Sequence, residues 1–304
     1  MSLQYTIASP VEVSGIGLHS AVPVKIRLLP AAANQGIIFR RTDLDGFEIP
    51  ASWRHIARVS YATSLMRKGV LISTTEHLLA ALYSTGVDNA VVEISSLELP
   101  ILDGSSEPFI RLLKQAGLRR QRARRSYLKL RRPVEVVEGS KRIAVFPHDG
   151  FRVTSSIDFP HPLIGRQEME LDLTPETFER EIAAARTFGF LDEIPQMKDM
   201  GLVRGGSLEN AVVFTRDSLL NTEGLRFPDE CCRHKVLDLI GDLALIGYPL
   251  RAHVVAERAG HAMHTALVLK LVRDRSLWEL TTADEPAHTH LPAMAELAVG
   301  GAWD

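Results

Sequence analysis

Apolar and polar residues follow the same order of patterns twice along this chain. Each half begins with short segments in which the two kinds alternate, a pattern typical of strands with one buried face. An apolar stripe at helical spacing follows, then one more short apolar run and a second helical stripe. In the first half the expected strands cover residues 11–13, 22–29, 36–40 and 89–95, and the expected helices 74–84 and 105–116. In the second half the expected strands cover 127–130, 142–146, 151–157 and 251–256, and the expected helices 230–245 and 261–272.

This repeated order predicts an α+β fold of two similar domains, each a mainly antiparallel sheet with helices on one face. Gly86 and Gly247 follow the first helix of each half, where a left-handed cap favours glycine. We expect the helices to pack between the two sheets, with an active site at the domain interface.

The expected domains cover residues 1–120 and 133–283, joined by a basic linker over 121–132. Extra short strands are expected within 41–72. A second insertion, over 189–215, contains Gly205-Gly206 between two apolar runs, which predicts a loop with a hairpin or helix. The tail over 284–304 has little periodicity, so we expect it to be loosely held despite its His288 and His290.

Composition narrows the function classes. The 304 residues carry a net charge of −2 and are 45% hydrophobic, the balance of an ordinary globular protein, and no apolar run reaches the roughly 18 residues of a membrane span. The first residues lack the basic and apolar regions of a secretory signal, so none is expected. Cys231 and Cys232 are neighbours and cannot cross-link the fold, which favours the cytoplasm.

Basic residues cluster once, between residues 117 and 133. The cluster could bind an anion or nucleic acid, but no aromatic residues alternate with its charges as single-strand binding requires. A solvated linker running into a strand is the favoured interpretation. With a net charge near zero as well, nucleic acid is not expected as a partner.

The helix over 230–245 carries the strongest chemical signal. His234, Asp238 and Asp242 form a stripe at i, i+4 and i+8, with Lys235 beside it and apolar residues opposite. A histidine and an aspartate four residues apart can aim a nitrogen and an oxygen at one divalent metal. A surface His–Asp pair is the alternative, because two ligands alone do not make a site.

Glu76 and His77 open the helix over 74–84 and could complete such a site. Catalytic zinc sites use three protein ligands and also need a carboxylate that is not a ligand to accept a proton from water. Neighbouring helix residues point about 100° apart, so His77 could bind the metal while Glu76 reaches the water. An exposed helix start with Glu opposing the dipole is the alternative.

His261 opens the last expected helix, where the helix dipole disfavours its charged form unless a carboxylate compensates. Asp242 could be that carboxylate and would keep His261 protonated, able to act as an acid. Otherwise His261 is an exposed histidine at a helix start. Thr187 is a further polar residue flanked by apolar ones.

Several motifs together carry a resemblance to a known family. They are TTEHLLAAL, ELPILDGSSEPF, ARTFGF, GLRFPDE, RHKVLDLIGDL, Ala259-Gly260-His261 and the early VSGIGLHS. From about residue 5 to about residue 273, the chain resembles the bacterial UDP-3-O-acyl-N-acetylglucosamine deacetylases, with all motifs in the family's order. These are zinc amidases of the committed step of lipid A synthesis.

The resemblance implies a cofactor and a catalytic set. One zinc ion per chain would be held by His77, His234 and Asp238, with Fe²⁺ as an alternative metal in the cell. Glu76 would be the general base. The remaining implied catalytic residues are His261 with its partner Asp242, Thr187 as donor to the oxyanion, and Lys235 for binding and electrostatics.

The resemblance also implies a substrate site, a substrate and a location in the cell. Phe188 would line the sugar site together with Lys235, and the insertion over 189–215 would form an apolar passage for the acyl chain. The suggested linings of that passage are Leu202, Val203, Ala211 and Val213. The implied partner is the UDP-linked acylated amino sugar, and we expect a monomer in the cytoplasm. The chain departs from the family at Met263-His264-Thr265, where we expect an effect on local packing alone.

The expected reaction is zinc-dependent hydrolysis of the sugar's N-acetyl group, giving acetate and a free amine. Two rivals remain open from the residues. A non-catalytic protein stabilised by metal would have a zinc closed by four protein ligands. A zinc peptidase would be expected to carry HExxH, which this chain lacks.

Overall fold

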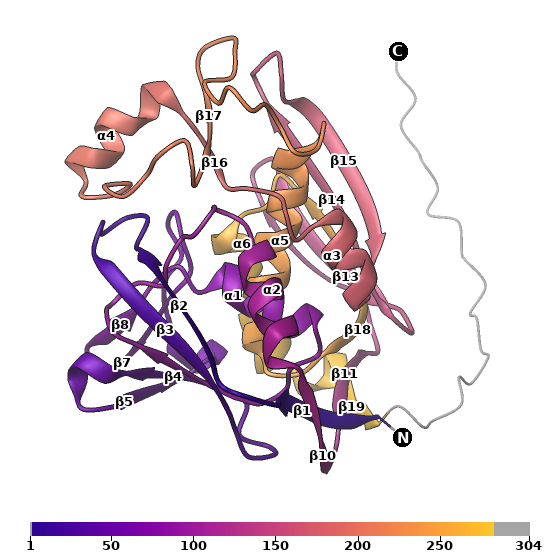
Figure 1. The fold of residues 1–304 in the computed structure, drawn as a ribbon. Coiled ribbons are helices and arrows are strands. Elements are labelled where there is room, and N and C mark those ends of the chain that lie inside the picture. The colour runs from indigo at the N-terminus through magenta and orange to yellow at the C-terminus, as the bar shows by residue number, and fades with distance from the viewer. Residues whose placement is uncertain (1, 283–304) are drawn as a thin grey trace, which may run out of the picture.

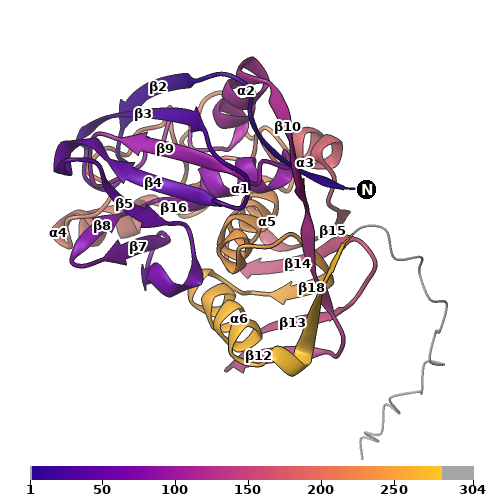
Figure 2. The ribbon, with the colours of Figure 1, turned by 90° about the horizontal axis from the view of Figure 1, so that it is seen from below.

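Helices form a layer between two β-sheets in the computed structural model, which describes residues 2–282 (Figures 1 and 2). The first sheet has the strand order β2-β3-β9-β4-β5. Its strands are β2 (Val11–Ile16), β3 (Pro23–Pro30), β9 (Ala90–Ile94), β4 (Ile37–Arg41) and β5 (Phe47–Pro50). All its pairs are antiparallel except β4 with β9.

The second sheet has seven strands, all from the second half of the chain. They are β11 (Ser126–Leu130), β12 (Val134–Glu138), β13 (Lys141–Pro147), β14 (Phe151–Phe159), β15 (Gly165–Asp172), β18 (Leu250–Glu257) and β19 (Trp278–Thr282). Strand β18 is central, antiparallel to β13 and parallel to β14 and β11. The other pairs are antiparallel, so both sheets are mainly antiparallel as predicted.

Six α-helices occur within residues 2–282. They are α1 (Glu76–Ser84), α2 (Glu107–Ala116), α3 (Pro175–Glu181), α4 (Ile194–Asp199), α5 (Glu230–Leu243) and α6 (His261–Arg273). Figure 2 shows α1, α5 and α6 between the two sheets. The four helices expected from apolar periodicity are confirmed as α1, α2, α5 and α6. Gly86 and Gly247 have φ values of 79° and 87°, the left-handed conformation expected after α1 and α5.

One hydrophobic core joins the two halves. Leu78 of α1, Val92 of β9, Leu239 of α5 and Val254 of β18 belong to the same buried cluster and are each 0% exposed. The helices therefore bury apolar faces against each other and against both sheets. This confirms the predicted class, an α+β fold of two sheet-and-helix halves, while the exact domain boundaries remain a prediction.

Three small sheets complete the fold. β6 (Ile56–Arg58), β7 (Ser64–Arg67) and β8 (Val70–Ile72) lie in the first expected insertion. β1 (Leu3–Ile7) pairs with β10 (Leu118–Arg124), so much of the basic segment is strand, with β11 following at Ser126. Periodicity missed β10 because its sequence, LRRQRAR, offers almost no apolar face.

The second insertion is not a hairpin. β16 (Phe188–Phe190) and β17 (Val212–Phe214) are parallel, with α4 between them. Parallel neighbours need a crossover connection, which the long segment containing α4 provides. The pair Gly205-Gly206 suggested a hairpin turn, but a Cβ on Gly205 would lie 2.4 Å from the carbonyl oxygen of Gly17. Gly205 thus permits a close approach between this insertion and the first half of the chain.

No helix within residues 2–282 is long and apolar enough to cross a membrane. The expected tail over 284–304, including His288 and His290, lies outside the described residues.

Candidate metal centre

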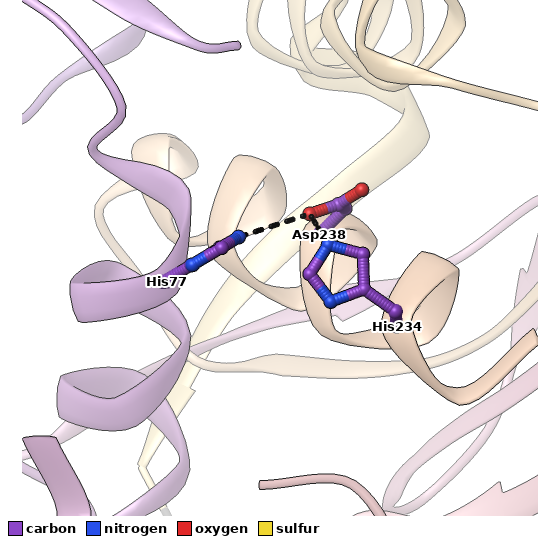
Figure 3. A group of neighbouring side chains, drawn as sticks. All are labelled: His77, His234 and Asp238. Carbon is purple, nitrogen blue, oxygen red and sulfur yellow. Dashed lines mark ion pairs between the residues drawn. The ribbon is translucent and has the colours of Figure 1, made fainter. Parts of the chain in front are cut away.

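Helices α1 and α5 cross closely and bring three candidate ligands together. Gly241 of α5 lies against the backbone of Glu76, where an added Cβ would be 2.1 Å from the carbonyl oxygen. At this crossing His77 of α1 faces His234 and Asp238 of α5 (Figure 3). The Nε2 atoms of His77 and His234 lie 3.8 Å and 3.4 Å from Oδ1 of Asp238. The predicted trio therefore converges from the two halves of the chain.

The two histidines of the trio have protonation states that suit metal ligands. Burial, reinforced by His234, lowers the pKa of His77 to about 3, and burial also lowers the pKa of His234. Both imidazoles are therefore neutral near pH 7. The Nδ1–H of His234 donates to the carbonyl oxygen of Ala185 at 3.0 Å, which leaves Nε2 free to bind a metal.

Asp238 is the anionic member of the candidate trio. Burial alone would raise its pKa, but electrostatic interactions with Lys235 and with the histidines around it, His234 and His261 foremost, outweigh burial and hold the pKa below its usual range. Lys235 donates to Oδ2 of Asp238 at 2.9 Å. Two neutral imidazoles and one carboxylate form a donor set that fits a catalytic zinc site with an open position. The residues present thus fit the expected metal.

Glu76 lies beside this trio without belonging to it. A carboxylate oxygen of Glu76, one of Asp238 and a ring nitrogen of His261 all lie within 4.8 Å of one another. Burial, reinforced by the charges of Asp238 and Asp242, raises the pKa of Glu76 to about 8 against the opposing charge of His261. Oε2 of Glu76 accepts a hydrogen bond from the backbone N–H of Thr63 at 3.0 Å. Glu76 is therefore held beside the trio as a carboxyl group that can exchange a proton near neutral pH.

His261, at the start of α6, pairs with Asp242 as expected. The Nδ1–H of His261 donates to Oδ2 of Asp242 at 2.7 Å. Burial would lower the pKa of His261, but Asp242 and Asp238 outweigh burial and raise it to about 9. His261 is therefore cationic near pH 7, with its Nε2 3.9 Å from Asp238.

Two residues that sequence reasoning gave no chemical role complete this network. His264, one helical turn after His261, places Nδ1 2.8 Å from the same Oδ2 of Asp242. Thr63 donates its hydroxyl to Oδ1 of Asp242 at 2.5 Å. The i, i+3 spacing of His261 and His264 could have indicated His264. No sequence pattern marks Thr63.

A cavity of about 650 Å³ opens beside the candidate ligands and extends along the second insertion. Thr187 and Phe188 line it near the ligands, and Lys235 lies 5.7 Å from the Phe188 ring centroid. Apolar side chains from the insertion line much of the rest. They include Ile194, Met197, Val203, Leu208, Ala211 and Val213. Three of the four suggested passage linings thus face the cavity.

Leu202 does not line this cavity. Its backbone N–H donates to the carbonyl oxygen of Met197 at 2.8 Å as the chain leaves α4, and the next residue, Val203, turns with φ of 48°. It is Val203 that reaches the cavity.

The early loop also reaches the cavity, which sequence reasoning missed. Leu18 and His19 line it, and the backbone N–H groups of Val203 and Gly205 donate to Nδ1 of His19 and to the carbonyl oxygen of Leu18. Leu18 and His19 lie in the VSGIGLHS motif. The chemical role of this motif could not be deduced without knowing that it contacts the insertion.

The sequence of this chain is similar to those of known proteins of one family. The family described as UDP-3-O-acyl N-acetylglycosamine deacetylase matches residues 4–273. A UDP-3-O-acyl-N-acetylglucosamine deacetylase of Solibacter usitatus is 60% identical over 287 residues, which cover 94% of this chain and 97% of that protein. Proteins of the same name from Myxococcus xanthus and Anaeromyxobacter dehalogenans are 46% and 47% identical. These matches cover 92% and 96% of this chain, and 90% and 96% of the two relatives.

Proposed function

Because the chain belongs to the UDP-3-O-acyl-N-acetylglucosamine deacetylase family, we propose that it hydrolyses the N-acetyl group of UDP-3-O-(3-hydroxyacyl)-N-acetylglucosamine. The products are acetate and the free 2-amine, and the reaction is the committed step of lipid A biosynthesis. The observation that carries this proposal is the convergence of His77, His234 and Asp238 beside Glu76, at a cavity with an apolar extension. The enzyme acts as a monomer in the cytoplasm.

His77, His234 and Asp238 would hold one zinc ion, with Fe²⁺ as the alternative for the same donors. A metal bound by these residues would supply Lewis-acid polarisation of the amide carbonyl and a lowered pKa of water, and its charge would favour the ionised form of Glu76. Glu76 accepts the proton of the attacking water. Its burial and its hydrogen bond from Thr63 support this role, because a general base must be fixed within reach of its proton.

His261 and Thr187 act on the charge that develops at the carbonyl oxygen. Thr187 lines the cavity next to Phe188, and its hydroxyl donates to the oxyanion. His261 carries a positive charge that stabilises the same oxygen, and its proton is available to the leaving amine. Its pairing with Asp242 supports this role, because that carboxylate keeps the imidazole charged.

Lys235 and the insertion bind the substrate. The charge of Lys235, half-buried beside Phe188, favours an anionic substrate group near the sugar. Val203, Ala211 and Val213 offer an apolar lining for an acyl chain in the cavity of about 650 Å³.

Acetate release tests this proposal. The purified protein, loaded with zinc, should release acetate from the acylated UDP-sugar far faster than from UDP-N-acetylglucosamine, which cannot fill the apolar passage. Peptides should not be cleaved. Equal rates on the two sugars, or peptide cleavage without acetate release, would contradict the proposed substrate.

A further inference from the structure

Thr63 touches both halves of the proposed proton-transfer machinery. It directly precedes β7 and is 0% exposed. Its backbone N–H donates to Oε2 of Glu76, and its hydroxyl donates to Oδ1 of Asp242. Its Oγ1 also lies 3.2 Å from Nδ1 of His261. One residue thus joins the proposed base to the carboxylate that orients the proposed acid.

The direction of these hydrogen bonds follows from the donors available. A carboxylate only accepts, and a hydroxyl has a single proton, so Thr63 is the donor to Asp242. Asp242 accepts at Oδ2 from His261 and His264. Within residues 2–282, Thr63 is the only side chain that donates to Oδ1. Without that donor, a buried oxygen of a charged carboxylate would lose its partner, and its plane would be less fixed.

Thr63 is itself held in place from α1. Its carbonyl oxygen accepts hydrogen bonds from the backbone N–H of Thr75 at 3.2 Å and from the Thr75 hydroxyl at 3.1 Å. Thr75 directly precedes Glu76, so two hydrogen bonds tie the loop before β7 to the start of α1. Next to it, the hydroxyls of Ser64 and Ser73 are 2.9 Å apart.

We propose that Thr63 is a positioning residue of the deacetylation, whose hydroxyl fixes Asp242 so that His261 points into the cavity. Its backbone N–H holds Glu76 at the same time. The inference rests on the proposed function, because it assigns Glu76 and His261 to the two proton transfers. Thr63 does not touch the substrate, and it acts through the side chains that do.

Two substitutions isolate the hydroxyl. Thr63→Val keeps the shape and the backbone N–H, and so the contact with Glu76, but removes the donor to Asp242. Thr63→Ser keeps the donor. We expect Thr63→Val to lower kcat about tenfold or more, since one hydrogen bond to a charged group is lost, with KM and metal content within about twofold of wild type. Thr63→Ser should restore most of kcat.

Thr85→Val is the matched control. The Thr85 hydroxyl donates to the carbonyl oxygen of Ala81 at 2.7 Å, at the far end of α1, so its loss should leave kcat unchanged. If Thr63→Val does not fold, Thr63→Ala replaces it, compared in the same way with Thr63→Ser. A kcat equal to wild type without the hydroxyl, or an equal loss in Thr63→Ser, would overturn the proposal.

A second measurement needs neither metal nor turnover. In metal-free protein with ¹⁵N-labelled histidine, the ring N–H resonances of His261 and His264 report their hydrogen bonds to Asp242. Thr63→Val should shift both, and Thr63→Ser should leave them near their wild-type positions. Unchanged resonances in Thr63→Val would overturn the inference even if the protein proved not to be a deacetylase. Absence of acetate release by wild type, in contrast, would overturn the proposed function alone.

Discussion

Gly241 of α5 and Glu76 of α1 are in backbone contact, at a separation that leaves no room for a side chain. A Cβ on Gly241 would lie 2.1 Å from the carbonyl oxygen of Glu76 and 2.7 Å from its carbonyl carbon. Both are backbone atoms inside the helical layer, so neither can rotate away. This contact sets how closely His77 approaches His234 and Asp238.

Gly241→Ala should therefore separate the two helices and weaken the metal site. Overpacking of this kind typically costs about 1–3 kcal/mol of unfolding free energy, and the ligands would no longer converge. Urea denaturation and zinc titration measure the two effects. Gly150→Ala is the control, because its Cβ would meet only the His148 ring, at 3.6 Å. Unchanged zinc affinity in Gly241→Ala would show that this contact does not set the site.

Glu76→Gln should separate metal binding from catalysis. The amide keeps the shape and can still accept from the N–H of Thr63, but it cannot accept a proton from water. We expect kcat to fall by about 10²–10⁴-fold while zinc content stays that of wild type. Glu176→Gln, an exposed change at the start of α3, should leave both kcat and zinc content at their wild-type values. Substantial turnover by Glu76→Gln would assign the base role elsewhere.

His261 should make stability depend on pH. Its pKa is raised from 6.5 to about 9 in the folded protein, chiefly because Asp242 and Asp238 overcome the effect of burial. The stability gained from this shift is complete below pH 6.5 and disappears as the pH rises through 9. The pKa of Asp242 itself is lowered from 3.8 to about 2 in the folded protein, so titration of Asp242 changes the stability only below pH 3.8.

Asp242→Asn should remove that contribution. In metal-free protein, the difference in unfolding free energy between wild type and Asp242→Asn should be largest near pH 6 and shrink towards pH 9.5. Urea denaturation at several pH values measures it. Asp149→Asn, at an exposed carboxylate, is the control. A difference independent of pH would mean that Asp242 does not raise the pKa of His261.

Ala211→Phe should shorten the acyl chain that the enzyme accepts. Ala211 lines the apolar part of the cavity, and a phenyl ring there would occupy the proposed passage. We expect KM for a long-chain substrate to rise about tenfold or more, with little change for a short-chain analogue. Steady-state kinetics on the two substrates measure this. A similar rise for both would place the acyl chain elsewhere.

The sequence predicted correctly the helical placement of those candidate residues whose spacing follows the period of a single helix. The i, i+4 spacing of His234 and Asp238 and the adjacent pair Glu76-His77 are helical features, and α5 and α1 carry them. The metal trio was therefore predictable once the family resemblance paired the two helices. The roles given to its members remain proposals.

Other contacts depend on tertiary structure alone. Thr63 precedes a short strand with no periodic signal, and only the folded chain brings it to Glu76 and Asp242. The parallel pairing of β16 with β17 was also missed. Gly205 there allows contact with Gly17, far away in sequence, and a glycine pair alone does not distinguish that use from a turn.

Zinc content measured together with acetate release, for wild type and His77→Ala, tests the central claim most directly. His77 is the one proposed ligand from the first half of the chain. We predict about one zinc per wild-type chain, and loss of both zinc and acetate release in His77→Ala. His148→Ala, outside the site, should retain both. A His77→Ala protein that still binds stoichiometric zinc and releases acetate would contradict a metal centre shared by α1 and α5.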